Sequence, residues 1–116
     1  MTALLWISTA VLVLAMGGIG GMKLARLDDA IEQAQRLGYD RIMIPIGIAE
    51  VATAVGVVLG AAVSDLDWLG GLSAAGIIVM MIGALGFHLR AGDKFENIPA
   101  LIVTTASVLY LIALTS

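Results

Sequence analysis

Four ionisable side chains near the ends of long apolar stretches are the residues best suited to chemistry: Lys23, Glu50, His88 and Arg90. Glu50 lies seven positions beyond Met43. At about 1.5 Å per residue of α-helix, its carboxyl group would lie roughly 10 Å inside the stretch. A carboxyl group in apolar surroundings needs a cationic partner, a proton or a water-filled cavity. Glu50 is therefore the most informative residue of the chain.

The elements that must position these side chains are four apolar stretches, which we expect to be helices over residues 3–24, 42–63, 68–90 and 98–115. Each approaches the ~20 residues that a helix needs to cross a bilayer. Their continuous apolar character favours helices over the alternating strands of a membrane barrel. The chain is 60% hydrophobic and 13% charged, with a mean hydropathy of +1.05. We predict a single all-α domain, residues 1–116, forming an integral membrane four-helix bundle.

The basic residues all lie in or beside the connections that follow the first and third predicted helices: Lys23, Arg26, Arg36, Arg41, Arg90 and Lys94. The connection over residues 64–67 has no basic residue, and its charged residues are Asp65 and Asp67. Cytoplasmic loops carry the excess of Lys and Arg. This asymmetry predicts that both basic connections are cytoplasmic and both termini are outside. We expect the membrane to be a bacterial inner membrane.

That topology brings Lys23, Glu50 and His88 to the same side of the membrane, with Arg90 and Asp93 just beyond them. We expect these side chains to converge in a polar pocket. A structural interpretation stays open beside the functional one. In it, Lys23 and Glu50 form a salt bridge, His88 makes an interfacial hydrogen bond and Arg90 anchors the third helix to headgroups.

The first connection carries a local helix signal. Asp29 is placed to cap a helix, Glu32 to complete a capping box three residues later, and Gly38 to end it. Three apolar residues would share one face: Leu27, Ile31 and Ala34. This pattern predicts a short interfacial helix lying on the membrane. A solvated linker is the alternative.

Glycine pairs recur at spacings that allow helices to approach closely: Gly17 with Gly21, Gly56 with Gly60, and Gly83 with Gly86. Close backbone approach stabilises helix pairs in lipid. We predict packing within the chain at these positions. Gly56 and Gly60 are also the first candidates for the contact surface of a homo-oligomer.

Composition excludes several classes of function. The chain has no cysteine and a net charge of −3, so we expect neither thiol chemistry nor nucleic-acid binding. One histidine with scattered carboxylates is a poor metal site. No nucleophile has a credible base beside it, so we predict no catalytic residue, no metal and no tightly bound cofactor, and lean against an enzyme.

Three segments resemble the DoxX-like family of small membrane proteins. They are Gly-Gly-Met-Lys-Leu at 20–24, Pro-Ile-Gly-Ile-Ala-Glu at 45–50 and His-Leu-Arg-Ala-Gly-Asp at 88–93. The resemblance implies a four-helix membrane fold, and it indicates four family-like positions: Lys23, Glu50, His88 and Arg90. Some members of the family are membrane subunits associated with redox reactions, which implies contact with a quinone or a redox partner.

Three classes of function follow. The leading hypothesis is an accessory membrane subunit whose cytoplasm-side pocket binds a quinone, a lipid or another small amphiphile, or docks a redox protein. A small proton-coupled transporter is the second, because Glu50 is a membrane carboxylate. A scaffold or assembly factor that acts through its glycine faces is the third.

Overall fold

A computed structural model describes residues 2–92 and 98–115, and every regular element in them is helical. The helices are α1 (Thr2–Leu12), the π-helix η1 (Val13–Gly17), α2 (Gly18–Leu24), α3 (Asp28–Leu37), α4 (Met43–Ala62), α5 (Asp67–Arg90) and α6 (Ile98–Leu114). Short 3₁₀ turns, Asp40–Ile42 and Ser64–Leu66, precede α4 and α5. This confirms the all-helical class. Asp93 and Lys94 lie outside the described residues.

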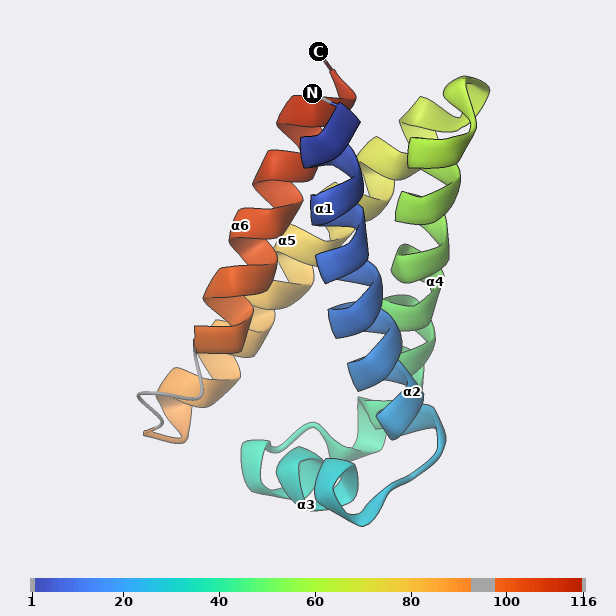
Figure 1. Ribbon diagram of the computed structural model, residues 1–116. Coiled ribbons are helices and arrows are strands. Elements are labelled where there is room, and N and C mark those ends of the chain that lie inside the picture. The colour runs from blue at the N-terminus through green and yellow to red at the C-terminus, as the bar shows by residue number, and fades with distance from the viewer. Residues whose placement is uncertain (1, 93–97, 116) are drawn as a thin grey trace.

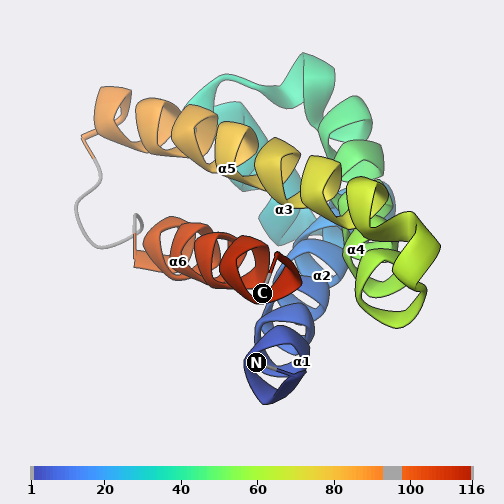
Figure 2. The ribbon, with the colours of Figure 1, turned by 90° about the horizontal axis from the view of Figure 1, so that it is seen from above.

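The long helices form a ring in which each packs against two others (Figures 1 and 2). α4 contacts α5, α5 contacts α6, α6 contacts α1, and α2 returns to α4. Both termini lie at one end of the bundle, and α3 lies across the other end. The molecule measures 40 × 26 × 17 Å, so its long axis exceeds the ~30 Å of a bilayer's hydrocarbon core.

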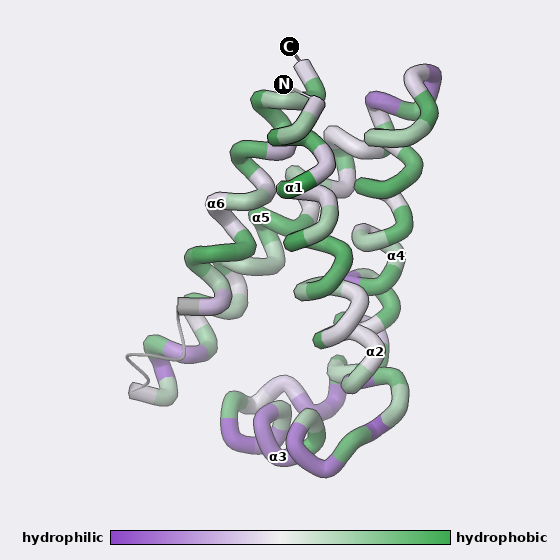
Figure 3. Tube along the Cα trace, in the orientation of Figure 1, coloured by the Kyte–Doolittle hydropathy of each residue, from purple (hydrophilic) through white to green (hydrophobic). Residues whose placement is uncertain are grey.

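The outer surface of the bundle is apolar. Three helical segments are long and apolar enough to cross a membrane, namely Thr2–Leu24, Asp40–Ala62 and Ser64–Arg90, and a shorter apolar helix covers Pro99–Leu114. Large side chains such as Leu14 and Val79 point outward without cover. Figure 3 shows the hydrophilic residues gathered mainly around α3, at the last turns of α5 and at the turn between α4 and α5. Such an apolar surface would be a liability in water and suits lipid.

The first long helix contains a π-helical turn that the sequence pattern did not predict. The turn covers Val13–Gly17, between α1 and α2. A π-turn inserts an extra residue and so changes which side chains face inward beyond it. Met16 is buried within this turn, and Gly20 and Lys23 are buried in α2 beyond it. Lys23, near the end of α2, thus faces the interior of the bundle.

Small residues close the end of the bundle that holds the termini. A Cβ atom at Gly60 of α4 would lie 2.7 Å from the Gly70 nitrogen of α5 and 2.8 Å from the Tyr110 hydroxyl of α6. One turn deeper, Gly56 lies directly against Ser73. Tyr110 is fully buried, and its hydroxyl donates a hydrogen bond of 2.7 Å to the Val57 carbonyl oxygen. At this end, α4 and α5 thus meet backbone to backbone, and the phenol of Tyr110 joins α6 to them.

The expected packing at the other glycines needs correction. A Cβ atom at Gly21, Gly83 or Gly86 would meet nothing within 4 Å, so these glycines make no close helix contact; Gly83 lines the cavity described below. At Gly17 it would make an ordinary contact of 3.9 Å with Ala54. The close approach lies one residue before Gly21: a Cβ at Gly20 would be only 2.9 Å from the Gly47 carbonyl oxygen.

The connection between α2 and α4 contains the helix α3, but its start differs from the predicted capping box. The N-cap is Leu27, which makes no side-chain cap, so Asp29 is the second residue of the helix. Gly38 ends the helix with a left-handed φ of 87°, as glycine permits. The buried face is centred on Ala30, Ala34 and Leu37. Leu27 is 48% exposed and does not belong to that face.

Candidate functional site

Lys23 and Glu50 form an ion pair inside the bundle. The Lys23 Nζ lies 2.5 Å from Glu50 Oε1, and the two side chains are only 10% and 3% exposed. The close crossing of α2 and α4 at Gly20 and Gly47 makes this pairing possible, since a larger residue at either glycine would push the helices apart. The pair satisfies a carboxylate that would otherwise be buried alone.

Tyr39, in the turn between α3 and α4, covers this ion pair. It is 7% exposed. Its ring centroid lies 5.3 Å from Lys23 Nζ and 5.6 Å from the ring centroid of Phe87 in α5. Burial raises the pKa of the Tyr39 phenol, the nearby Glu50 charge adds to the rise, and Arg36 opposes it. The phenol therefore stays protonated at neutral pH.

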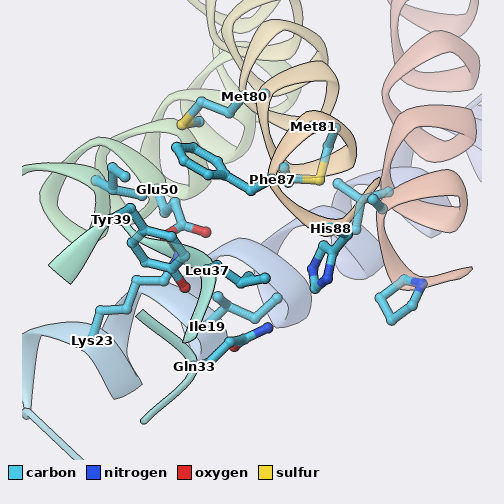
Figure 4. A pocket seen from close by; sticks show the side chains of 16 residues that line it. Ile19, Lys23, Gln33, Leu37, Tyr39, Glu50, Met80, Met81, Phe87 and His88 are labelled. Atoms are coloured by element: carbon cyan, nitrogen blue, oxygen red, sulfur yellow. Dashed lines mark hydrogen bonds and ion pairs between the residues drawn. The ribbon is translucent and has the colours of Figure 1, made fainter. Parts of the chain in front are cut away.

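A cavity of about 450 Å³ opens beside the ion pair, at the end of the bundle that carries α3 (Figure 4). Its walls come from α2, α3, α4, α5 and α6. The lining residues are Ile19, Lys23, Gln33, Leu37, Tyr39, Ile46, Glu50, Met80, Met81, Gly83, Ala84, Phe87, His88, Pro99, Ala100 and Val103. Most of these are apolar, so the cavity combines an apolar body with a few polar groups, as small-molecule sites do.

The structure brings three of the four predicted site residues to this cavity. Lys23 and Glu50 line it together as an ion pair, and His88 lines it from α5. Figure 4 shows His88 on a different wall from Glu50, with the cavity between them. His88 is 7% exposed. The residues thus share one cavity without forming a single cluster.

Arg90 does not line the cavity, which corrects its predicted place in the pocket. Its guanidinium donates a hydrogen bond of 3.4 Å to the Leu37 carbonyl oxygen at the end of α3 and lies 5.3 Å from the Phe87 ring centroid. The last carbonyls of a helix lack partners within it, so an arginine is well suited to bind them. Arg90 fastens α3 to α5.

Sequence reasoning missed two groups that complete the cavity. Tyr39 and Gln33 both line it, although neither belongs to an apolar stretch. The sequence does single out Tyr39, because it is the only aromatic residue between residues 24 and 42. No comparable signal marks Gln33, whose contribution depends on how α3 is rotated. The first connection therefore supplies part of the site as well as the link between two helices.

The arrangement is suited to binding. Tyr39, the ion pair and His88 offer hydrogen-bonding groups at the edge of an apolar chamber. In residues 2–92 and 98–115, no group of three or more His, Asp or Glu side chains could hold a metal ion. A second hollow, between α1 and α6, is lined by Val11, Leu101, Ile102, Thr105, Ala106 and Leu109 and offers no charged group.

Comparison with known protein families matches residues 7–114 to the DoxX-like family. No curated protein sequence and no solved structure is significantly similar to the chain. The match extends from α1 to the end of α6 and so includes every wall of the cavity. Together with the apolar helices, it identifies a membrane protein. The chain belongs to the DoxX-like family.

Proposed function

We propose that this protein binds a small amphiphile in the cavity beside Lys23 and Glu50 and acts as a non-catalytic, accessory membrane subunit. The observation that carries the proposal is the cavity itself, about 450 Å³ with apolar walls and a polar edge. A ligand with a polar head and an apolar body matches that division. A quinone and a neutral lipid both have this form.

In the proposed topology, four helices span a bacterial inner membrane and both termini are outside. The basic connections, with α3, then face the cytoplasm, in keeping with the distribution of Lys and Arg. The last span is the shortest, because the 17 residues of α6 extend only about 25 Å. This topology places the cavity in the cytoplasmic leaflet, where a ligand can enter from the bilayer.

The polar groups favour a small molecule over the other candidates. A redox protein would dock on an exposed surface, whereas Lys23, Tyr39 and Glu50 are all buried. A proton-coupled transporter needs a carboxylate that changes partners during transport. Glu50 is instead held by Lys23 at 2.5 Å, which supports a structural and recognition role for the pair.

The test uses two glycines of α5 that differ only in what they face. A Cβ atom added at either Gly83 or Gly86 would meet nothing within 4 Å, but only Gly83 is among the residues that line the cavity. Decylubiquinone and monoolein are titrated calorimetrically into the full chain in phosphatidylcholine nanodiscs, with empty nanodiscs as the background. We expect saturable binding of at least one probe to the wild-type protein and to Gly86→Leu.

Gly83→Leu should weaken that binding at least tenfold, because leucine fills part of the cavity. Equal binding by Gly83→Leu and Gly86→Leu would place the ligand elsewhere and overturn the proposal. Binding of neither probe beyond the empty-nanodisc background would also count against it.

A further inference from the structure

The Tyr39 hydroxyl belongs to a buried residue and has no hydrogen-bond partner in the described part of the chain. Tyr39 is 7% exposed and lines the cavity. A buried tyrosine hydroxyl usually has a hydrogen-bond partner, as Tyr110 has in the Val57 carbonyl oxygen. Within residues 2–92 and 98–115, the Tyr39 hydroxyl has none. The Tyr39 hydroxyl is therefore available to form a hydrogen bond with a ligand in the cavity.

The charges beside Tyr39 cancel one another. Among the described residues that line the cavity, Lys23 is the one lysine or arginine, and Glu50, its partner at 2.5 Å, is the one carboxylate. An anionic head group would have to displace Glu50 from Lys23 and lie next to its charge. A cationic head group would meet Lys23 in the same way. Either would disturb a buried ion pair, which is strongly unfavourable.

The groups around Tyr39 keep its hydroxyl in the form that donates. Burial and the Glu50 charge both raise the pKa of this phenol, and the outward-lying Arg36 acts in the opposite direction. A protonated phenol donates one hydrogen bond and accepts others. A carbonyl oxygen is the simplest uncharged acceptor that it can bind.

We infer that the cavity selects an uncharged amphiphile whose carbonyl oxygen accepts a hydrogen bond from the Tyr39 hydroxyl, while its apolar part lies among Ile46, Met80 and Val103. The inference rests on the proposed amphiphile-binding function and adds the ligand's charge class and the residue that recognises its head. A quinone ring and an acylglycerol ester share this chemistry. The ion pair acts as a charge filter beside the hydrogen bond.

The experiment compares three probes in phosphatidylcholine nanodiscs: decylubiquinone, monoolein, and 1-oleoyl-lysophosphatidic acid, which is monoolein with an added phosphate. The wild-type protein should bind at least one neutral probe at least tenfold more tightly than it binds lysophosphatidic acid. If decylubiquinone alone binds, the carbonyl belongs to a quinone; if monoolein alone binds, it belongs to an ester. Equal or tighter binding of the phosphate overturns the charge selection while the amphiphile-binding function stands.

Two variants test the separate parts. Tyr39→Phe should weaken the neutral probe about three- to tenfold, as expected for one lost hydrogen bond, whereas Tyr110→Phe, away from the cavity, should not change its affinity. Glu50→Gln frees Lys23 and should shift the preference toward the phosphate at least tenfold. Unchanged affinity in Tyr39→Phe would remove Tyr39 from recognition. Failure of all three probes to bind would overturn the inference together with the proposed function.

Discussion

At the end of the bundle that holds the termini, α4, α5 and α6 meet with little between them. Gly60 faces Gly70, and the Tyr110 hydroxyl lies against both glycines while it donates to Val57. At the other end, the same three helices diverge around a cavity of about 450 Å³. The end with the termini, which we call the closed end, is stabilised by close backbone contact. The end with the cavity, which we call the open end, is stabilised by α3 and a buried ion pair.

The two buried tyrosines, one at each end of the bundle, differ in whether the protein satisfies their hydroxyl groups. Tyr110 has its hydroxyl satisfied by the protein at 2.7 Å, as a structural residue should. Tyr39 is almost as well buried, yet its hydroxyl has no partner among the described residues. The closed end uses its polar groups for its own stability. The open end leaves one available, which is what a binding site requires.

The largest effect is expected at the ion pair of the open end. Lys23→Met leaves Glu50 buried without a counter-charge and should lower the free energy of unfolding by about 3–5 kcal/mol. The double variant Lys23→Met/Glu50→Gln removes both charges and should recover most of that loss. Reversible unfolding in mixed micelles measures both. If the single and double variants were equally unstable, the loss would not come from an unpaired buried charge, which would contradict this prediction.

A smaller effect is expected from adding one methyl group to the closed end. Gly70→Ala would place a Cβ 2.9 Å from the Gly60 Cα, and such overpacking should cost about 1–3 kcal/mol of unfolding free energy. Gly71→Ala is the matched control, because a Cβ there meets nothing within 4 Å. It should leave stability unchanged or raise it by up to ~1 kcal/mol. Equal losses at both positions would contradict close packing at this end.

The smallest effect is expected when the two tyrosines are replaced by phenylalanine in ligand-free protein. Tyr110→Phe loses the hydrogen bond to Val57 and should cost about 1 kcal/mol of unfolding free energy. Tyr39→Phe loses no described hydrogen bond, so ligand-free protein should unfold at an unchanged denaturant concentration. Unfolding of delipidated protein in mixed micelles provides the measurement. A loss in Tyr39→Phe as large as that in Tyr110→Phe would mean that the open end is satisfied by its own groups.

Residue types and chain order were enough to predict much of this arrangement. Apolar stretches indicated the helices, and the direction of each helix placed Lys23, Glu50 and His88 at one end. The structure has all three at one cavity. Such reasoning succeeds because helix direction follows from connectivity alone, and a buried carboxylate strongly favours a nearby cation.

Rotation of the helices was harder to predict. An apolar helix in a membrane has few polar residues to indicate its inward face, and the π-turn at Val13–Gly17 changes the register of the first helix. Spacing favoured Gly21, whereas the close contact is made by Gly20. Arg90 was misjudged and Tyr39 was missed for another reason, since the roles of both depend on where α3 lies.

The most direct test of the central claim is a density map of the protein purified in lipid nanodiscs. We expect elongated density between α5 and α6 inside the cavity, with its head within hydrogen-bonding distance of the Tyr39 hydroxyl and Lys23 still paired with Glu50. A cavity closed by the approach of α5 toward α2, with the Tyr39 hydroxyl bonded to a protein group, would contradict the account.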